Sequence, residues 1–137
     1  MSDFTTIEPV GWKKPSGYSH GIAASGRIVV TAGQIGWDPV TAEFKSDDFV
    51  QQVAQTLRNI VEVLNAAGAK PDQLVRLTWF ITDRDKYLNC RKEIGAVYRE
   101  IIGAHFPPMS VIVVSGLIEK RAKVEIEATA VVPHLPT

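Results

Sequence analysis

The sequence predicts an α+β fold in which two helices pack on one face of a single mixed β-sheet. Two apolar runs, Met109–Ser115 and Val124–Val132, are rich in β-branched residues and have the length of strands. Two longer segments, 49–64 and 87–101, repeat apolar residues at helical spacing. The predicted order is ββ-α-β-α-ββ, and two helices with one apolar stripe each are most simply placed on the same side of one sheet.

The first two strands are predicted to form a hairpin. His20–Ala24 and Arg27–Gln34 have the composition of strands, and the serine and glycine between them fit a two-residue turn. Gly33 lies at the end of the second strand, where a glycine often marks a close approach of the backbone. Residues 1–17 contain two prolines and two glycines and are expected to be an irregular lead-in. The whole chain, 1–137, is expected to form one domain without an internal linker.

Capping and stop residues mark the helix boundaries. A polar residue between Ser46 and Asp48 can cap the first helix, and Gly68 ends it. A strand is predicted at Gln73–Thr82, after which Asp83 or Asp85 starts the second helix. The polar residues expected on the outer face of the first helix are Gln51, Gln52, Gln55, Arg58, Asn59 and Glu62.

Composition excludes several classes of protein. Lys plus Arg and Asp plus Glu both number 15, so the formal net charge is zero, which argues against a nucleic-acid or anionic-membrane surface. No apolar stretch is long enough to span a bilayer, and the first residues do not resemble a secretory signal. The single cysteine, Cys90, cannot form an internal disulfide and is expected to be a buried, inert thiol on the second helix. A cytoplasmic location is therefore expected.

The apolar content of the strands predicts self-association. Ile28 to Val30 and Val111 to Val114 are apolar on both faces, yet the helices can cover only one face of the sheet. An exposed apolar face of that size favours association with another subunit. We therefore expect an oligomer.

Two carboxylates lie within the last predicted strand. Glu125 and Glu127 are two residues apart, and strand side chains alternate, so both project from the same face. An ionised carboxylate is costly to bury unless it is paired, hydrogen-bonded or wet. Either this face meets solvent, or one glutamate is held in a cleft for a function.

Four segments resemble the RidA (YjgF) family. They are Tyr18-Ser19-His20-Gly21, Val30-Thr31-Ala32-Gly33-Gln34, Phe106-Pro107-Pro108-Met109-Ser110, and Leu117 followed by Val124-Glu125-Ile126-Glu127-Ala128. The resemblance implies a chorismate-mutase-like α+β fold and a homotrimer with ligand clefts between subunits. It also implies cofactor-free hydrolysis of reactive enamines and imines, which pyridoxal-phosphate enzymes release, to a keto acid and ammonia.

The resemblance assigns roles to individual residues. Glu125 matches the family's glutamate that orients the attacking water. Tyr18, Thr31 and Gly33 fall where members line the cleft, and Ala32 stands where a serine is frequent. The alternative for Tyr18 is an interface aromatic with a wet hydroxyl.

The match to the family is broken at the substrate-carboxylate site. The family's signature is proline, a small residue, arginine and a small residue, whereas this chain has Pro107, Pro108, Met109 and Ser110. Arginine binds a carboxylate through two parallel hydrogen bonds, and a thioether cannot. Met109 is therefore expected to be a cleft wall or a core filler. Arg91, on the second helix, is the candidate to supply charge from another direction.

These residues bear on three possible functions. The first is a hydrolytic deaminase acting on a small enamine or imine other than a standard 2-imino acid, with Glu125 as the catalytic residue. The alternative is a non-catalytic trimer that binds a small metabolite. RNA cleavage, attached to the family by name, is disfavoured by the neutral charge and by the absence of a basic stripe. No metal site is expected, because His20, His105 and His134 are dispersed and no cysteine cluster accompanies them.

Overall fold

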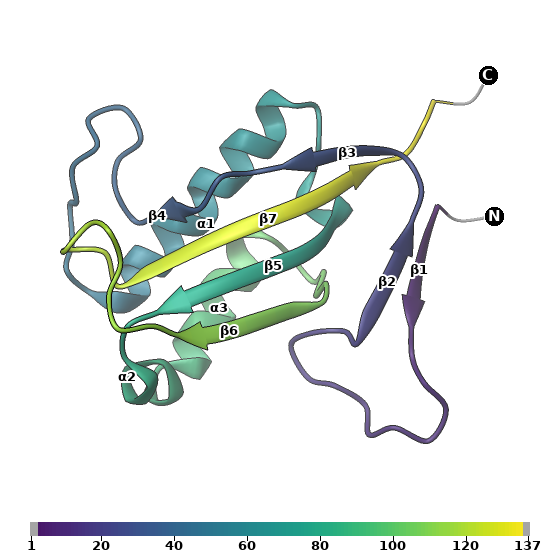
Figure 1. The fold of residues 1–137 in the computed structure, drawn as a ribbon, viewed down its shortest axis with the longest axis horizontal. Coiled ribbons are helices and arrows are strands. Elements are labelled where there is room, and N and C mark those ends of the chain that lie inside the picture. The colour runs from purple at the N-terminus through teal and green to yellow at the C-terminus, as the bar shows by residue number, and fades with distance from the viewer. Residues whose placement is uncertain (1–2, 136–137) are drawn as a thin grey trace.

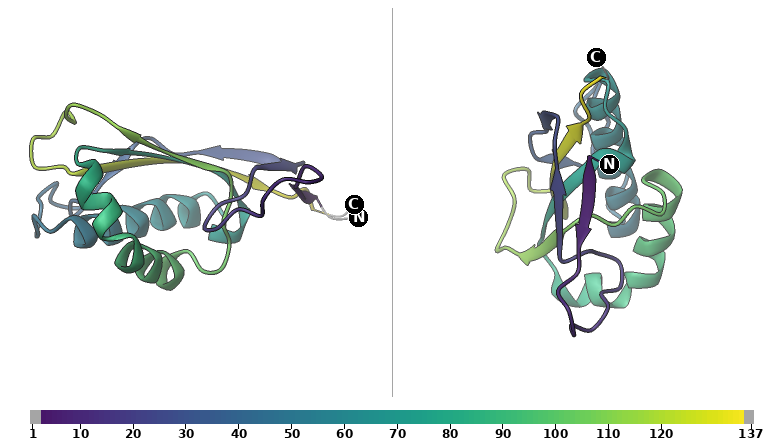
Figure 2. Two further views of the ribbon diagram at one scale, coloured as in Figure 1. Left: turned by 90° about the horizontal axis from the view of Figure 1, so that it is seen from below. Right: turned by 90° about the vertical axis from the view of Figure 1, so that its right-hand side faces the viewer.

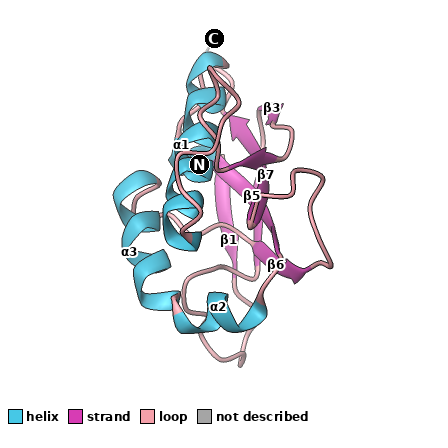
Figure 3. Cartoon of the chain, turned by 90° about the vertical axis from the view of Figure 1, so that its left-hand side faces the viewer, coloured by secondary structure: helices cyan, strands magenta, loops and turns pink. Residues whose placement is uncertain are grey.

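The chain forms a layer of helices against one face of a mixed β-sheet (Figures 1 and 2). The structure is a computed structural model, and it describes residues 3–135. The helices are α1 (Phe49–Ala66), α2 (Arg84–Asn89) and α3 (Arg91–Ile101), with a short 3-10 turn, η1 (Pro71–Gln73), before the strand that follows α1. Figure 3 shows the helices on one side of the strands, so the predicted α+β architecture is confirmed.

The main sheet is built around its last strand, β7 (Val124–Val132). Its order is β3-β7-β5-β6, and the short strand β4 (Gln34–Ile35) also pairs with β7. Strands β3 (Arg27–Val30) and β5 (Leu74–Ile81) run antiparallel to β7, whereas β6 (Met109–Val113) runs parallel to β5. The strands predicted near the end of the chain are therefore present, but they are separated by β5 rather than paired with each other.

The predicted N-terminal hairpin is wrong. Strand β2 (Gly21–Ala24) pairs with β1 (Phe4–Ile7) in a separate two-stranded sheet, while β3 pairs with β7. Gly26 links the two sheets, with φ of 150°, and a Cβ at this position would overlap the carbonyl of Val132. The glycine is thus required by close approach to β7 rather than by a hairpin turn.

Strand β1 also corrects the prediction of an irregular lead-in. Residues 4–7 form a strand because they pair with β2, a partner that local sequence does not reveal. The remainder of the lead-in, between β1 and β2, contains no helix or strand. Figure 1 shows this small sheet beside the end of the main sheet where β3 begins and β7 ends.

The second predicted helix is split in two. The Asp83 carboxylate accepts a hydrogen bond of 3.0 Å from the Lys86 N–H and so caps α2, as predicted. The backbone leaves helical geometry at Cys90, with φ of −110° and ψ of 13°, and α3 begins at the next residue. Cys90 is half-buried at this junction and packs against the core, instead of lying on a continuous apolar stripe.

Helix α1 buries two polar residues that the sequence placed on its outer face. The Asn59 amide donates to the carbonyls of Ile35 and Trp37, at 3.0 and 2.9 Å. The Gln52 side chain donates to the Arg121 carbonyl at 3.0 Å and accepts from the Lys123 N–H at 2.8 Å. These bonds satisfy buried polar groups and fix β4 and the start of β7 against α1.

The main hydrophobic cluster lies between the helices and the sheet. Four of its residues are 0% exposed: Leu57, Ile60, Leu77 and Ile126. On the other face, Ile28, Val30 and Ile112 are 67%, 68% and 42% exposed. The chain thus leaves the second sheet face uncovered, as the sequence predicted. Among residues 3–135, no helix has the length and apolar character needed to cross a membrane.

Candidate functional site

A cavity of about 480 Å³ opens where β6 begins, on the helix side of the sheet. Its walls come from the loop before β2, from β5 and β6, and from α2 and α3. Three of the predicted site residues, Tyr18, Arg91 and Met109, line this cavity. The full lining is Ser16, Gly17, Tyr18, Trp79, Tyr87, Arg91, Ile94, Gly95, Tyr98, Arg99, Phe106, Met109 and Val111.

Met109 is half-buried at the first position of β6. It is paired with the buried Leu77 of β5, so its side chain projects toward the helices and contacts the core. Hydrogen bonds hold the turn before it: the Tyr98 hydroxyl donates to the His105 carbonyl at 2.7 Å. His105 Nε2 lies 2.7 Å from the Leu74 carbonyl and must donate there. The Met109 wall of the cavity is therefore rigidly supported.

Aromatic rings form much of the remaining wall. The rings of Tyr98 and Phe106 are stacked, with centroids 5.3 Å apart and planes 17° from parallel. Burial raises the pKa of Tyr98, and it raises the pKa of Tyr87 against the opposing effect of Arg91. Both tyrosines thus stay neutral at physiological pH, and the charge in the lining comes from arginines.

Trp79 contributes a buried donor to this cavity. The residue is 3% exposed, and its indole Nε1 has no hydrogen-bond partner within the described chain. An indole N–H can only donate, and leaving it unpaired is unfavourable. The sequence gives no sign of this role, because nothing in it distinguishes a tryptophan that lines a cavity from one in the core.

Tyr18 is held by ring contacts at the cavity rim. It is 42% exposed, and its ring meets His20 edge-on, with centroids 5.5 Å apart. On the other side, His20 meets Trp12 edge-on at 4.9 Å. These contacts order the loop that carries Tyr18, and they leave its hydroxyl available.

A second group of predicted residues lies on the opposite face of the sheet. Glu125 is half-buried and paired with Phe80, whereas its neighbour Ile126 is paired with Trp79 and buried in the core. By alternation, the Glu125 side chain projects away from the helices. A Cβ at Gly33 would overlap the Glu125 carboxylate, so only glycine permits this close approach. No hydrogen bond or ion pair within residues 3–135 occupies that carboxylate.

Thr31 fixes the segment that carries Gly33. Its N–H donates to the Ala128 carbonyl at 2.9 Å, and its hydroxyl accepts from the Ala128 N–H at 3.1 Å. The hydroxyl is thus buried against β7, where it positions the segment. The exposed Ala32 presents its carbonyl to the Gln34 side chain at 3.2 Å.

Within one chain the predicted site residues therefore form two groups. Tyr18, Arg91 and Met109 line the cavity, whereas Thr31, Ala32, Gly33 and Glu125 lie at the other face. Ser110 is exposed and paired with Thr78, so it belongs to the Glu125 face and not to the cavity. The two groups cannot act on one ligand within a single copy.

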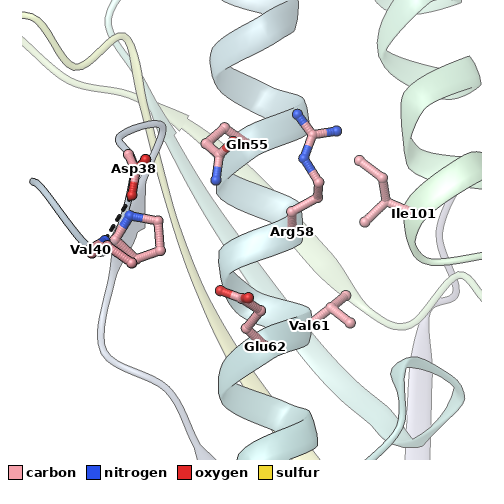
Figure 4. A pocket seen from close by; sticks show the side chains of 8 residues that line it. Asp38, Val40, Gln55, Arg58, Val61, Glu62 and Ile101 are labelled. Atoms are coloured by element: carbon pink, nitrogen blue, oxygen red, sulfur yellow. Dashed lines mark hydrogen bonds between the residues drawn. The ribbon is translucent and has the colours of Figure 1, made fainter. Parts of the chain in front are cut away.

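A separate hollow of about 500 Å³ lies on the outer side of α1, and it contains none of the predicted site residues (Figure 4). Asp38 at its edge accepts a hydrogen bond of 2.8 Å from the Val40 N–H and pairs with Lys45 at 3.0 Å. These two interactions lower the pKa of Asp38. The Asp38 carboxylate therefore stabilises the turn. The charged residues of α1 in this hollow are exposed to solvent.

No group of three or more histidine, cysteine or acidic residues within positions 3–135 could hold a metal ion. One group instead offers a carboxylate that has no hydrogen bond or ion pair with the described residues, and the other offers arginines with an indole donor. Trp79, Tyr98 and Arg99 were not predicted as site residues from the sequence. The spacing of Arg91, Gly95 and Arg99 along one helix face was the signal available for the last.

Comparison with known proteins identifies the family. Residues 12–132 match the family model described as endoribonuclease L-PSP. The 2-iminobutanoate/2-iminopropanoate deaminase of Salmonella typhimurium is 37% identical over 109 residues, covering 77% of this chain and 80% of that protein. The human protein of the same name is 30% identical over 111 residues, covering 81% and 77%.

Solved structures agree with this assignment. YyfB from Yersinia pestis, described as a conserved Rid family protein, superposes with a TM-score of 0.81 at 33% identity, covering 96% of this chain and all of that one. E. coli TdcF, solved with bound serine, gives a TM-score of 0.67 at 34% identity, covering 89% and 91%. The chain belongs to the endoribonuclease L-PSP family, whose members include the RidA and YjgF proteins.

Proposed function

We propose that this protein is a cytoplasmic hydrolase that converts a small reactive imine or enamine to a carbonyl compound and ammonia. Relatives named 2-iminobutanoate/2-iminopropanoate deaminase support this reaction class. The observation that carries the proposal is the half-buried Glu125 carboxylate, which has no hydrogen bond or ion pair within residues 3–135 and lies against Gly33 on the uncovered sheet face.

The site is proposed to lie between two copies of a homotrimer. The Glu125 group and the cavity group occupy opposite sides of one chain, so a ligand can meet both only where two copies adjoin. The sheet face exposes the apolar residues Ile28, Val30 and Ile112, and exposed apolar surface of this kind favours burial against another copy. A closed ring of copies would use the same contact at each boundary.

The proposed chemistry needs no cofactor. Water adds to the carbon of the C=N bond while Glu125 accepts a proton from that water. The tetrahedral carbinolamine then collapses, the nitrogen takes up a proton and leaves as ammonia, and the carbonyl forms. The balance is one imine plus one water to one carbonyl compound plus one ammonia. Imines hydrolyse readily without a catalyst, so positioning of the water and a general base accounts for useful acceleration.

Met109 supports the second candidate function, a trimer that binds a small metabolite without turnover. A thioether cannot hold a carboxylate, so a small 2-imino acid would lack an anion-binding group at this position. The two candidates differ in one measurement: release of ammonia from 2-imino acids generated in situ, compared with buffer alone. Release that disappears in Glu125→Gln supports the hydrolase, and a trace equal to buffer supports the binding protein.

A further inference from the structure

The face of α3 toward the cavity carries two arginines and a glycine at spacing four. Arg91, Gly95 and Arg99 all line the cavity, and no acidic residue does. Within the described chain the ion pairs are Lys45 with Asp38 and Arg121 with Asp47, so neither of these arginines has an acidic partner. Two exposed arginines that line an apolar-walled cavity favour an anionic ligand.

Gly95 leaves space that the helix itself does not require. It lies in the middle of α3, where glycine costs about 1 kcal/mol relative to alanine. Its φ is not positive, and a Cβ there would lie 3.8 Å from Arg99 Nη1, which is an ordinary contact. Neither backbone geometry nor crowding therefore explains this glycine. The missing side chain keeps the cavity wall open between the two arginines.

Trp79 points independently to a ligand. Trp79 lines this cavity, and its indole N–H is buried and has no acceptor within residues 3–135. Buried donors are almost always paired, and an indole N–H needs an oxygen or nitrogen acceptor. A ligand that carries such an atom would satisfy it.

The rest of the wall fits a broad, flat apolar group. The stacked Tyr98 and Phe106 rings, Tyr87 and the thioether of Met109 surround a space of about 480 Å³, which is large for a three- or four-carbon acid. Aromatic rings and sulfur make favourable contacts with an aromatic ring.

We propose that this cavity binds a carboxylate that bears an aromatic side group, held by Arg91 and Arg99, with the Trp79 N–H donating to a ligand acceptor. The inference rests on the proposed function in one respect: the substrate would then be an aromatic 2-imino acid, and the product an aromatic 2-keto acid and ammonia. Met109, in place of a charged group, provides apolar contact for the ring.

The test is a binding titration of the intact protein with two keto acids, phenylpyruvate and 2-oxobutanoate. Calorimetry gives both affinities, and proton–nitrogen NMR follows the indole N–H signals, with the Trp79 signal assigned from Trp79→Phe. We expect phenylpyruvate to bind at least 10-fold more tightly and to shift the Trp79 signal. Equal affinities, or binding that leaves the Trp79 signal unmoved, would overturn the proposal.

Variants of α3 sharpen the test. The double variant Arg91→Gln and Arg99→Gln should weaken phenylpyruvate binding by at least 10-fold, whereas Lys92→Gln, which removes one charge from the same helix outside the cavity, should stay within twofold. Gly95→Leu keeps both arginines but fills the space, and it should also lose the aromatic ligand. Circular dichroism confirms that each variant is folded. If the arginine variant binds as well as Lys92→Gln, the assignment is wrong.

These experiments distinguish failure of the proposed ligand class from failure of the proposed reaction. Tight phenylpyruvate binding without ammonia release from any imino acid would contradict the proposed reaction and retain the ligand class. Ammonia release from 2-iminobutanoate with no preference for an aromatic ligand would retain the reaction and contradict the ligand class.

Discussion

The two groups of site residues differ in how the fold supports them. The Glu125 face is built on backbone: Thr31 is hydrogen-bonded twice to Ala128, and Gly33 packs against the carboxylate. The cavity is built on side chains, with stacked rings, half-buried Met109 and two arginines of α3. A backbone-supported carboxylate tolerates little change in position, whereas a side-chain cavity can change its ligand by substitution. We infer that reaction type is set at the first group and ligand choice at the second.

The largest expected effect is at the carboxylate itself. Glu125→Gln keeps the shape of the side chain but removes the proton acceptor, and loss of a general base lowers rates on the order of 100-fold or more. The ammonia-release assay measures this. The exposed Glu127 lies on the same strand face, so Glu127→Gln is the matched control and should retain activity. Equal rates in the two variants would remove Glu125 from the mechanism.

Gly33→Ala should have the next largest effect. The added Cβ would overlap the Glu125 carboxylate and displace it, so we expect about 10-fold lower activity, because small misplacements of catalytic groups are costly. Gly33 itself is exposed, so the melting temperature should change little. Gly116→Ala serves as control, since nothing lies within 4 Å of a Cβ at that position. Unchanged activity in Gly33→Ala would show that the carboxylate can move without consequence.

Thr31→Val tests how the backbone segment is positioned. The substitution leaves the buried Ala128 N–H without the Thr31 hydroxyl as acceptor, which costs about 1–2 kcal/mol of unfolding free energy. Urea denaturation measures the loss. We expect activity to fall while phenylpyruvate binding at the cavity is kept; equal losses of both would contradict the separation of the two groups.

The smallest effect concerns Tyr98 and alkaline pH. The pKa of Tyr98 is raised by burial above its ordinary value of 10.0. The stability that the neutral phenol contributes is therefore complete below pH 10, and it declines as pH rises from there toward the raised pKa, because the unfolded state ionises first. Tyr98→Phe removes the hydrogen bond to the His105 carbonyl, so its free energy of unfolding should be about 1 kcal/mol lower at neutral pH. Above pH 10, the free energy of unfolding of this variant should fall less steeply with pH than that of the wild type. Equal slopes for the two proteins above pH 10 would show that the raised pKa of Tyr98 does not cause the loss of stability.

Much of the fold could be predicted from local pattern. The stripe of α1, the Asp83 cap and the apolar runs of β6 and β7 each reflect periodicity or capping chemistry that the sequence displays. The N-terminal pairing could not be predicted, because β1 and β2 are joined by a long loop and Gly26 is explained only by its contact with Val132. Gln52 and Asn59 were misplaced for a similar reason: their partners lie in distant segments.

The part of the candidate site that lies in sequence motifs could be predicted, and the part that is formed by packing could not. Glu125 and Gly33 came from motif positions, and the structure places them together. The cavity residues Trp79 and Tyr98 carry no local sign of function, because a cavity arises from what the neighbouring elements leave unfilled. The break at Cys90, which sets the direction of α3, was also invisible to helical periodicity.

The central claim is that one site takes Glu125 from one copy and the cavity from another. Mixing Glu125→Gln with Gly95→Leu, each of which is expected to lose ammonia release from an aromatic 2-imino acid, tests it directly after unfolding and joint refolding. If copies assort at random, about a quarter of the sites combine an intact Glu125 with an intact cavity, so ammonia release should recover to about a quarter of the wild-type rate. A mixture as inactive as its two components would show that both groups act within one chain, or not at all, and would contradict the account.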